Sequence, residues 1–363
     1  MNALSHIWHT IQRELFPILQ ETLDPLTELM QKLIIVLEVS EIARHVRERH
    51  WRSIGRPKKD RQAIASAFVA KMVLNLPTTR ALIERLHADR NLRRICGFER
   101  LSDLPDESTF SRAFAEMAES KLPERVHAAL IEKHHSDSWV AHLSRDSTAI
   151  ESREKPAKKY PKAPRKKNKR GRPKKGEVVE KKPPTVLEQQ QTMTLPQVLA
   201  HLPQAADHGC KKNSKGYVES WIGYKLHIDT ADSGVPISLI LTSASVHDSQ
   251  VAIPLALTSA QRVQSCYDLM DAAYDSSIIT THSESLGHVP IIDSNPRRGE
   301  KREMDPAKLE RYKIRTTAER ANARLKDEFG GRTLRVKGPT KAMAHLMFGV
   351  IALTVDQLMR MIA

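Results

Sequence analysis

The chain of 363 residues is strongly basic, with 58 Lys and Arg against 43 Asp and Glu and a formal net charge of +15. It is long enough for two or three domains with cores of their own. The charge predicts a polyanionic partner, and the three scattered cysteines argue against a disulfide framework or a zinc site.

Attachment to a membrane surface is the competing interpretation of so basic a chain. The sequence holds no run of 18 apolar residues, and it does not begin with a basic region followed by an apolar stretch and a cleavage site. The most apolar segment, residues 342–362, is polar at its ends and is expected to pack on the preceding domain or on a second subunit. We therefore expect a cytoplasmic protein that does not enter a membrane.

Residues 1–135 have the pattern of a helical region. Apolar residues recur at helical spacing over 63–74, and Thr78 or Thr79 can cap a following helix that ends at Gly97. A third helix is expected to open at residues 105–108. Short helices separated by turns suit a DNA-binding and oligomerisation module, although a plain helical bundle fits nearly as well.

A basic segment follows the first strand. Residues 151–185 contain fifteen Lys and Arg against four Glu, with few aliphatic side chains. Such a composition cannot bury enough apolar surface to order itself, so a disordered insertion is expected at about 151–215.

Two copies of Gly-Arg-Pro resemble the core of the AT-hook, which threads the minor groove of A·T-rich DNA. One copy surrounds Arg56. The other lies within the basic segment and comprises Arg170, Gly171, Arg172 and Pro173. Either copy could instead be a basic linker that binds any phosphate backbone.

Beyond residue 136 the apolar pattern changes from helical to strand-like. Asp146 lies near the end of the first strand and Asp271 at the end of the fourth, while Asp293 reads as a turn residue. The predicted strands are 139–150, 223–229, 235–245, 266–271 and 289–292, and the predicted helices between them are 248–260 and 276–286.

A charged stripe marks the next helix, predicted over residues 309–329 without Pro or Gly. At about 100° per residue, its members fall within roughly a quarter of the helix surface. They are Tyr312, Arg315, Glu319 and Lys326. The plainer interpretation is a solvated face with ion pairs four residues apart.

The spacing of these four residues resembles the Tyr-Arg-Glu-Lys signature of bacterial insertion-sequence transposases of the DDE class. Further local matches are Asp146-Ser147-Thr148, His247-Asp248 and Asp271-Ala272-Ala273-Tyr274. The resemblance implies an α/β catalytic domain over 136–330, with a ribonuclease H-like mixed five-stranded sheet, and a helical segment over 331–363. Asp146, Asp271 and Glu319 would then be catalytic residues and metal ligands.

The same resemblance implies roles for the remaining residues. Tyr312, Arg315 and Lys326 would contact the DNA backbone, whereas His247 and Asp248 would support the site from behind or pack the loop. Asp268 or Asp275 could each replace Asp271, although side chains alternate along a strand and Asp268 would need an irregular one.

The implied chemistry is cutting of double-stranded DNA at the terminal repeats of the element and joining of the freed end to target DNA. Two Mg²⁺ or Mn²⁺ ions suit three carboxylates. A homo-oligomer on DNA and a bacterial, nucleoid-associated location are expected. The alternatives are a metal-dependent nuclease without strand transfer and a non-catalytic DNA-binding relic. Only 47 residues separate Asp271 from Glu319, so the large β-rich insertion that related enzymes use for a hairpin route has no room there.

Overall fold

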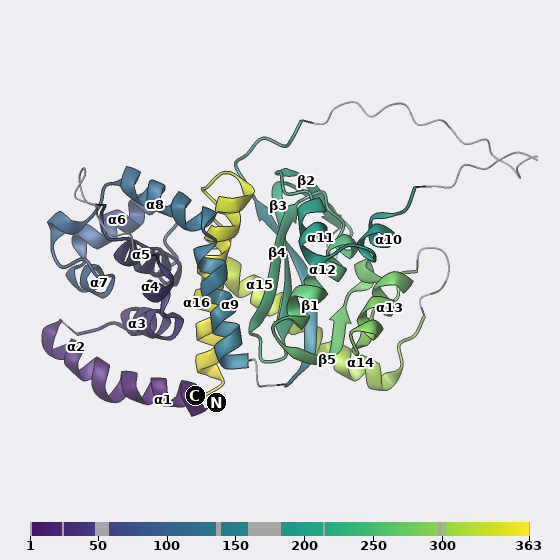
Figure 1. Cartoon of the computed structure of the whole chain (residues 1–363), viewed down its shortest axis with the longest axis horizontal. Helices are drawn as coiled ribbons and strands as arrows, with labels where there is room; N and C mark the ends of the chain where they lie inside the picture. The colour runs from purple at the N-terminus through teal and green to yellow at the C-terminus, as the bar shows by residue number, and fades with distance from the viewer. Residues whose placement is uncertain are drawn as a thin grey trace, which may run out of the picture.

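The computed structural model describes residues 2–23, 25–47, 58–135, 139–158, 183–212, 215–296, 300 and 302–362. A helical region and a sheet with flanking helices lie on either side of the long helix α16, Pro339–Arg360 (Figure 1). The chain thus returns at its end to the junction between its two parts.

The region before the sheet is helical, as predicted. Thr78 caps α6 by accepting a hydrogen bond from the Ala81 amide at 3.0 Å. The single helix expected up to Gly97 is two, because Asp89 takes an extended conformation, ends α6 and caps α7. The elements are α1 Asn2–Thr10, the π-helical η1 Ile11–Leu15, α2 Phe16–Thr22, α3 Glu28–Ser40, α4 Ile42–His45, α5 Arg61–Val73, α6 Thr79–Ala88, α7 Arg90–Ile95, η2 Leu101–Asp103, α8 Glu107–Glu119 and α9 Leu122–His135.

Helix α16 is the core element of the junction. By length and composition it could cross a membrane, but 78% of its most apolar window is buried inside the protein. Its Phe348 ring lies 5.6 Å from Phe68 of α5 and 6.1 Å from Phe114 of α8. The expectation that this segment packs back on the chain is therefore confirmed.

The sheet has six strands rather than the five expected. Strand β3 runs antiparallel to β1, β2 and β4, and β5 and β6 run parallel to β1. The order is β2-β3-β1-β5-β6, with β4 also paired to β3. The strands are β1 Trp139–Glu151, β2 Asp207–Lys212, β3 Val218–Ala231, β4 Pro236–Ser243, β5 Gln264–Met270 and β6 Val289–Ile292. Three antiparallel strands followed by two reached through helices is the predicted sequence of elements.

Helices cover both faces of this sheet. Figure 1 shows α10, α11 and α12 on one side of β4, with α15, α9 and α16 on the other. The bounds are α10 Val186–Gln190, α11 Leu195–His201, α12 Ser249–Ala260, α13 Ser277–Ser285, α14 Pro306–Tyr312 and α15 Thr316–Asp327. Helices α12 and α13 and strand β6 agree closely with the sequence prediction.

The prediction of a disordered insertion as far as residue 215 is wrong at its C-terminal side. Residues 186–212 form α10, α11 and β2. Leu202 and Val246 pack into one apolar cluster with Ile240 of β4 and Leu255 of α12, which orders this stretch. Residues 159–182, with Arg170, Gly171, Arg172 and Pro173, lie outside the described residues, as does Arg56.

The long helix expected over 309–329 is also interrupted. A 3₁₀ turn, η4 Lys313–Arg315, separates α14 from α15. The angular positions calculated for one continuous α-helix therefore do not hold between Tyr312 and Glu319. A 3₁₀-helix has three residues per turn, whereas an α-helix has 3.6.

Candidate active site

Strand register brings two predicted acids together. In the parallel pair β1–β5, Arg145 lies opposite Met270, so Asp146 is the next residue of β1 and Asp271 is the first residue after β5. Neighbouring strands lie about 4.8 Å apart, so the two backbones are adjacent at this level. Asp146 was expected near the end of its own strand, but β1 continues to Glu151 in its pairing with β3. It lies instead where β5 ends.

A third acid follows from the same register. Met270 lies opposite Ile292 in the parallel pair β5–β6, and the Asp293 amide donates a hydrogen bond to the Met270 carbonyl at 3.2 Å. The charge of Asp293 also raises the pKa of Asp271. The sequence interpretation of Asp293 as a turn residue missed this proximity, although an acid directly after a short apolar strand was the available signal.

Both of the paired carboxyl groups are hard to ionise. Burial, and secondarily Asp271, raises the pKa of Asp146 to about 6, while Arg315 and Asn322 lower it. Burial also raises the pKa of Asp271, together with the charges of Asp248 and Asp293 and against a hydrogen bond from the Ala273 amide at 2.9 Å. This site therefore favours a cation.

Arg315 provides one such cation from the helix side. Its Nη1 lies 3.9 Å from Asp146 Oδ1, and its Nη2 forms an ion pair with Glu319. The guanidinium also lies 5.6 Å from the centre of the Tyr312 ring. Asn322, which the sequence reasoning missed, donates from Nδ2 to Asp146 Oδ2 at 3.1 Å. Its position seven residues after Arg315, on the same helix face, could have indicated it.

Lys326 lies farther along α15 than the other members of the stripe. Burial lowers its pKa, and Lys211 of β2 and Arg332 lower it further. Asp146 thus lies beside Asp271, and Arg315 links Asp146 to Glu319, whereas Lys326 lies near Lys211 and Arg332.

His247 and Asp248 make different contacts. Asp248 accepts from Lys225 Nζ at 2.9 Å, and its charge raises the pKa of Asp271, so it lies close behind the acids. His247 is exposed and its Nδ1 lies 2.8 Å from Ser249 Oγ at the start of α12. Lys225 was missed, although it is a polar residue within an apolar strand.

The alternatives to Asp271 are engaged elsewhere. Asp268 is buried and accepts from Ser283 Oγ at 2.5 Å, with His288 Nδ1 at 3.2 Å. Asp275 accepts from the Asn295 amide at 2.9 Å. Asp271 is the member of this set that lies beside Asp146.

Among the described residues, no group of three or more His, Cys, Asp and Glu is placed to hold a metal ion. The carboxylate of Glu319 is half-exposed and turned to Arg315. Asp146 and Asp271 nevertheless fit a hard divalent cation, because they are adjacent oxygen donors whose charge is only partly compensated. Two buried polar atoms close to them lack partners among the described atoms, the Tyr274 hydroxyl and Asn322 Oδ1.

Two family models match separate parts of the chain. Residues 184–355 match a family described as a transposase DDE domain, and residues 18–116 match one described as a transposase domain (DUF772). The first match contains Asp271 and Glu319 and begins after Asp146. No curated protein and no solved structure matches the chain. The DDE domain implies a ribonuclease H-like fold for the sheet. Together the two matches support an insertion-sequence transposase of the DDE class.

Proposed function

We propose that the protein cuts DNA at the ends of an insertion sequence and joins the freed ends to target DNA by metal-dependent phosphoryl transfer. The observation that carries this proposal is the register of β1 and β5, which places Asp146 beside Asp271 at the end of a parallel strand. The family matches support DNA as the substrate.

In this proposal Asp146 and Asp271 hold the metal, and Glu319 completes the set. Two Mg²⁺ or Mn²⁺ ions would activate the attacking oxygen and stabilise the leaving oxygen. Arg315 has two roles in this proposal. Without DNA, its positive charge compensates the carboxylates of Asp146 and Glu319. When DNA binds, its guanidinium turns to a backbone phosphate and frees the Glu319 carboxylate.

The remaining residues position the DNA. Tyr312 lies against Arg315, and in this proposal it contacts the same backbone. Lys326 and Lys211 hold phosphates farther along the strand. Asp248, fixed by Lys225, supports Asp271 from behind. The AT-hook-like segments around Arg56 and Arg172 hold A·T-rich DNA.

The two chemical steps balance without a further reactant. A water oxygen bonds to phosphorus, the bond from phosphorus to the 3′ oxygen breaks, and that oxygen leaves as a 3′-hydroxyl after taking a proton. This hydroxyl then attacks a target phosphodiester, whose own 3′ oxygen leaves. Joining two ends requires two active sites, so we propose a homo-oligomer on DNA, acting at the bacterial nucleoid in the cytoplasm.

The test uses the full chain and a plasmid that carries the ends of the element, with Mg²⁺, Mn²⁺ or EDTA. Wild type should give metal-dependent cuts and joined products. Asp271→Asn and Glu319→Gln should each lower cutting at least 100-fold and keep DNA binding near normal. Glu310→Gln, which removes an exposed acid from α14, is the matched control and should retain activity.

Three other outcomes would separate the alternatives. Cutting without joining would identify a nuclease, and binding without cutting under any metal would identify a DNA-binding relic. Retained cutting in both acid variants would overturn the assignment of the site.

A further inference from the structure

A cavity lies at the junction of the helical region and α16, away from Asp146 and Asp271. Its volume is about 260 Å³. Lys71 of α5 lines it, together with Lys341 and His345 of α16 and with Arg335 and Lys337 from the loop that precedes α16. These residues come from segments more than 250 positions apart in the chain, so only the tertiary structure brings them together.

Lys71 is the unusual member of this cavity. Its residue surface is 5% exposed, and no ion pair or side-chain hydrogen bond to it exists among the described residues. Burial lowers its pKa to about 8, so the ammonium still carries a charge at pH 7. The side chain is buried while its ammonium is not fully enclosed, so this unpaired charge is placed where an anion in the cavity can compensate it.

The other walls add positive charge and no negative charge. Among the residues that the structure describes, no Asp or Glu lines the cavity. Arg335, Lys337 and Lys341 are exposed and, like Lys71, make no ion pair with any described residue. Burial lowers the pKa of His345 to about 3, so it is neutral, and its Nε2 lies 3.1 Å from the Gly330 carbonyl.

The N-terminus of α16 adds to the positive electrostatic potential of the cavity. This helix has 22 residues, begins after Gly338 and has no acid in its first turn. The unpaired amides of a helix N-terminus carry a partial positive charge that favours anions.

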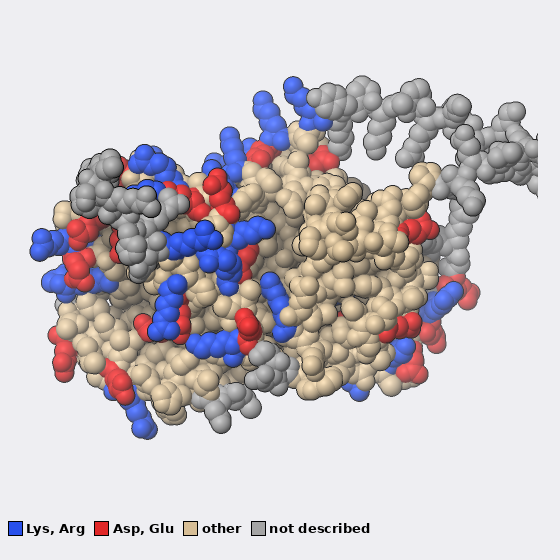
Figure 2. All heavy atoms as spheres, in the orientation of Figure 1, with Lys and Arg blue, Asp and Glu red and all other residues tan. Residues whose placement is uncertain are grey.

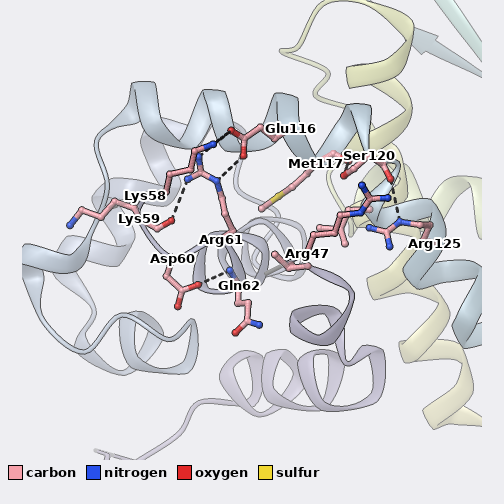
Figure 3. Close-up of a pocket in the computed structure, with 12 residues that line it drawn as sticks. Arg47, Lys58, Lys59, Asp60, Arg61, Gln62, Glu116, Met117, Ser120 and Arg125 are labelled. Atoms are coloured by element: carbon pink, nitrogen blue, oxygen red, sulfur yellow. Dashed lines mark hydrogen bonds and ion pairs between the residues drawn. The ribbon is translucent and has the colours of Figure 1, made fainter. Parts of the chain in front are cut away.

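A larger cavity in the helical region shows that basic walls alone do not imply a ligand. It has a volume of about 390 Å³ and is lined by Lys58, Arg61 and Glu116, among others (Figure 3). Glu116 lies 3.0 Å from Lys58 Nζ and 3.0 Å from Arg61 Nε. These cations are compensated within the protein, unlike those around Lys71.

We propose that the cavity of Lys71, Arg335, Lys337 and Lys341 binds a phosphate group, and that this group belongs to the DNA on which the protein acts. The choice of DNA as the source rests on the proposed function, while the phosphate site itself does not. Figure 2 shows many Lys and Arg side chains, with some Asp and Glu among them, over the junction between the helical region and the sheet, whereas the face over α11 and α12 is almost free of charge.

The loop before α16 connects this cavity to the candidate active site. It follows α15 directly, and Arg332 within it lies close enough to Lys326 to lower the pKa of that lysine. DNA that leaves the acids along α15 would therefore reach Lys337 and the cavity next. Phosphate contacts of this kind fix the register of DNA without reading its sequence.

The first experiment measures thermal unfolding of the full chain in inorganic phosphate and in chloride at equal ionic strength. Phosphate should raise the Tm of wild type, and Lys71→Met should lose most of this shift. Lys71→Met should be at least as stable as wild type in chloride, because it removes an unpaired buried charge. Lys341→Gln, an exposed change, should reduce the shift even if Lys71→Met does not fold. Lys58→Gln should keep the full shift.

The second experiment measures DNA binding against salt concentration without metal, so that cutting plays no part. Loss of one phosphate contact should reduce the slope of log K against log salt by about 0.9 in Lys71→Met or Lys341→Gln. An unchanged slope with a lost phosphate shift would keep the phosphate site and overturn DNA as its source. No phosphate shift in wild type, with an unchanged slope in both variants, would overturn the proposal as a whole.

Discussion

Asp146, the proposed metal ligand, opposes the stability of the fold that holds it. It lies beside Asp271, and its carboxyl group is largely shielded from water, with a side chain 19% exposed. Arg315 and Asn322 compensate only part of the unfavourable charge. This arrangement is expected at a cation site, because the acids are held together before the cation arrives.

We predict that Asp146→Asn stabilises the protein in EDTA. A carboxyl group whose pKa is raised from 3.8 to about 6 in the folded state opposes folding above pH 6 and has no such effect below about pH 4. The variant should gain on the order of 1–3 kcal/mol in urea unfolding at pH 7 and lose this advantage at pH 4. Equal stabilities at pH 7 would contradict the raised pKa.

At the scale of elements, close approach of two backbones decides how α16 packs. Gly349 lies in the middle of this helix, where a Cβ atom would come within 2.4 Å of the Phe329 carbonyl oxygen and 3.0 Å of Leu325 Cδ1. The end of α15 and the turn that follows it therefore rest on this glycine. A carbonyl oxygen on the backbone has little freedom to move away.

Gly349→Ala should consequently destabilise the protein, by about 2 kcal/mol through overpacking. Helix propensity alone predicts the opposite sign, a gain of about 1 kcal/mol. Chemical denaturation distinguishes the two directly. Gly349→Val should cost more than Gly349→Ala, and a stabilised alanine variant would show that α16 can shift outwards.

Secondary structure was predictable where one periodic pattern governed a segment. The hairpin of β3 and β4, helices α12 and α13, and strand β6 follow from alternation and helical spacing. Strand β2 was not found, because the whole of residues 151–215 was assigned to a disordered insertion, although β2 pairs with the strand that follows it in the chain, β3. The interruption of the helix at η4 was not predicted either, because Lys313-Ile314-Arg315 contains no Pro or Gly to indicate it.

At the scale of the whole molecule, buried histidines join the two parts. His127 of α9 lies with Nε2 2.9 Å from the Pro236 carbonyl at the start of β4, and Arg262 Nη1 lies 3.4 Å from its Nδ1. His345 binds α16 to the turn at Gly330. Burial lowers the pKa of both histidines to about 3.

The protein should therefore lose stability in acid. Each histidine is neutral in both the folded and the unfolded state above its unfolded pKa of 6.5. As pH falls from 6.5 toward 3, the histidine takes up a proton in the unfolded state but not in the folded state, so the free energy of unfolding decreases. Each histidine should add about 1.4 kcal/mol per pH unit to the slope of the unfolding free energy in that window. His127→Leu should make the slope shallower by about one proton, and an unchanged slope would contradict a neutral His127.

The sequence by itself determined a basic chain suited to a polyanionic partner, a helical first part, a mixed sheet, and acids that follow apolar strands. Each of these depends on composition or on spacing over a few residues, which is how local structure is encoded. Only the tertiary structure decided that Asp146, Asp271 and Asp293 share one level of the sheet, and that Arg315 faces both Asp146 and Glu319. It also decided that Arg335, Lys337 and Lys341, which make no ion pair with the described residues, meet around Lys71. These arrangements depend on strand register and on contacts between distant segments, for which no fixed spacing in the chain exists.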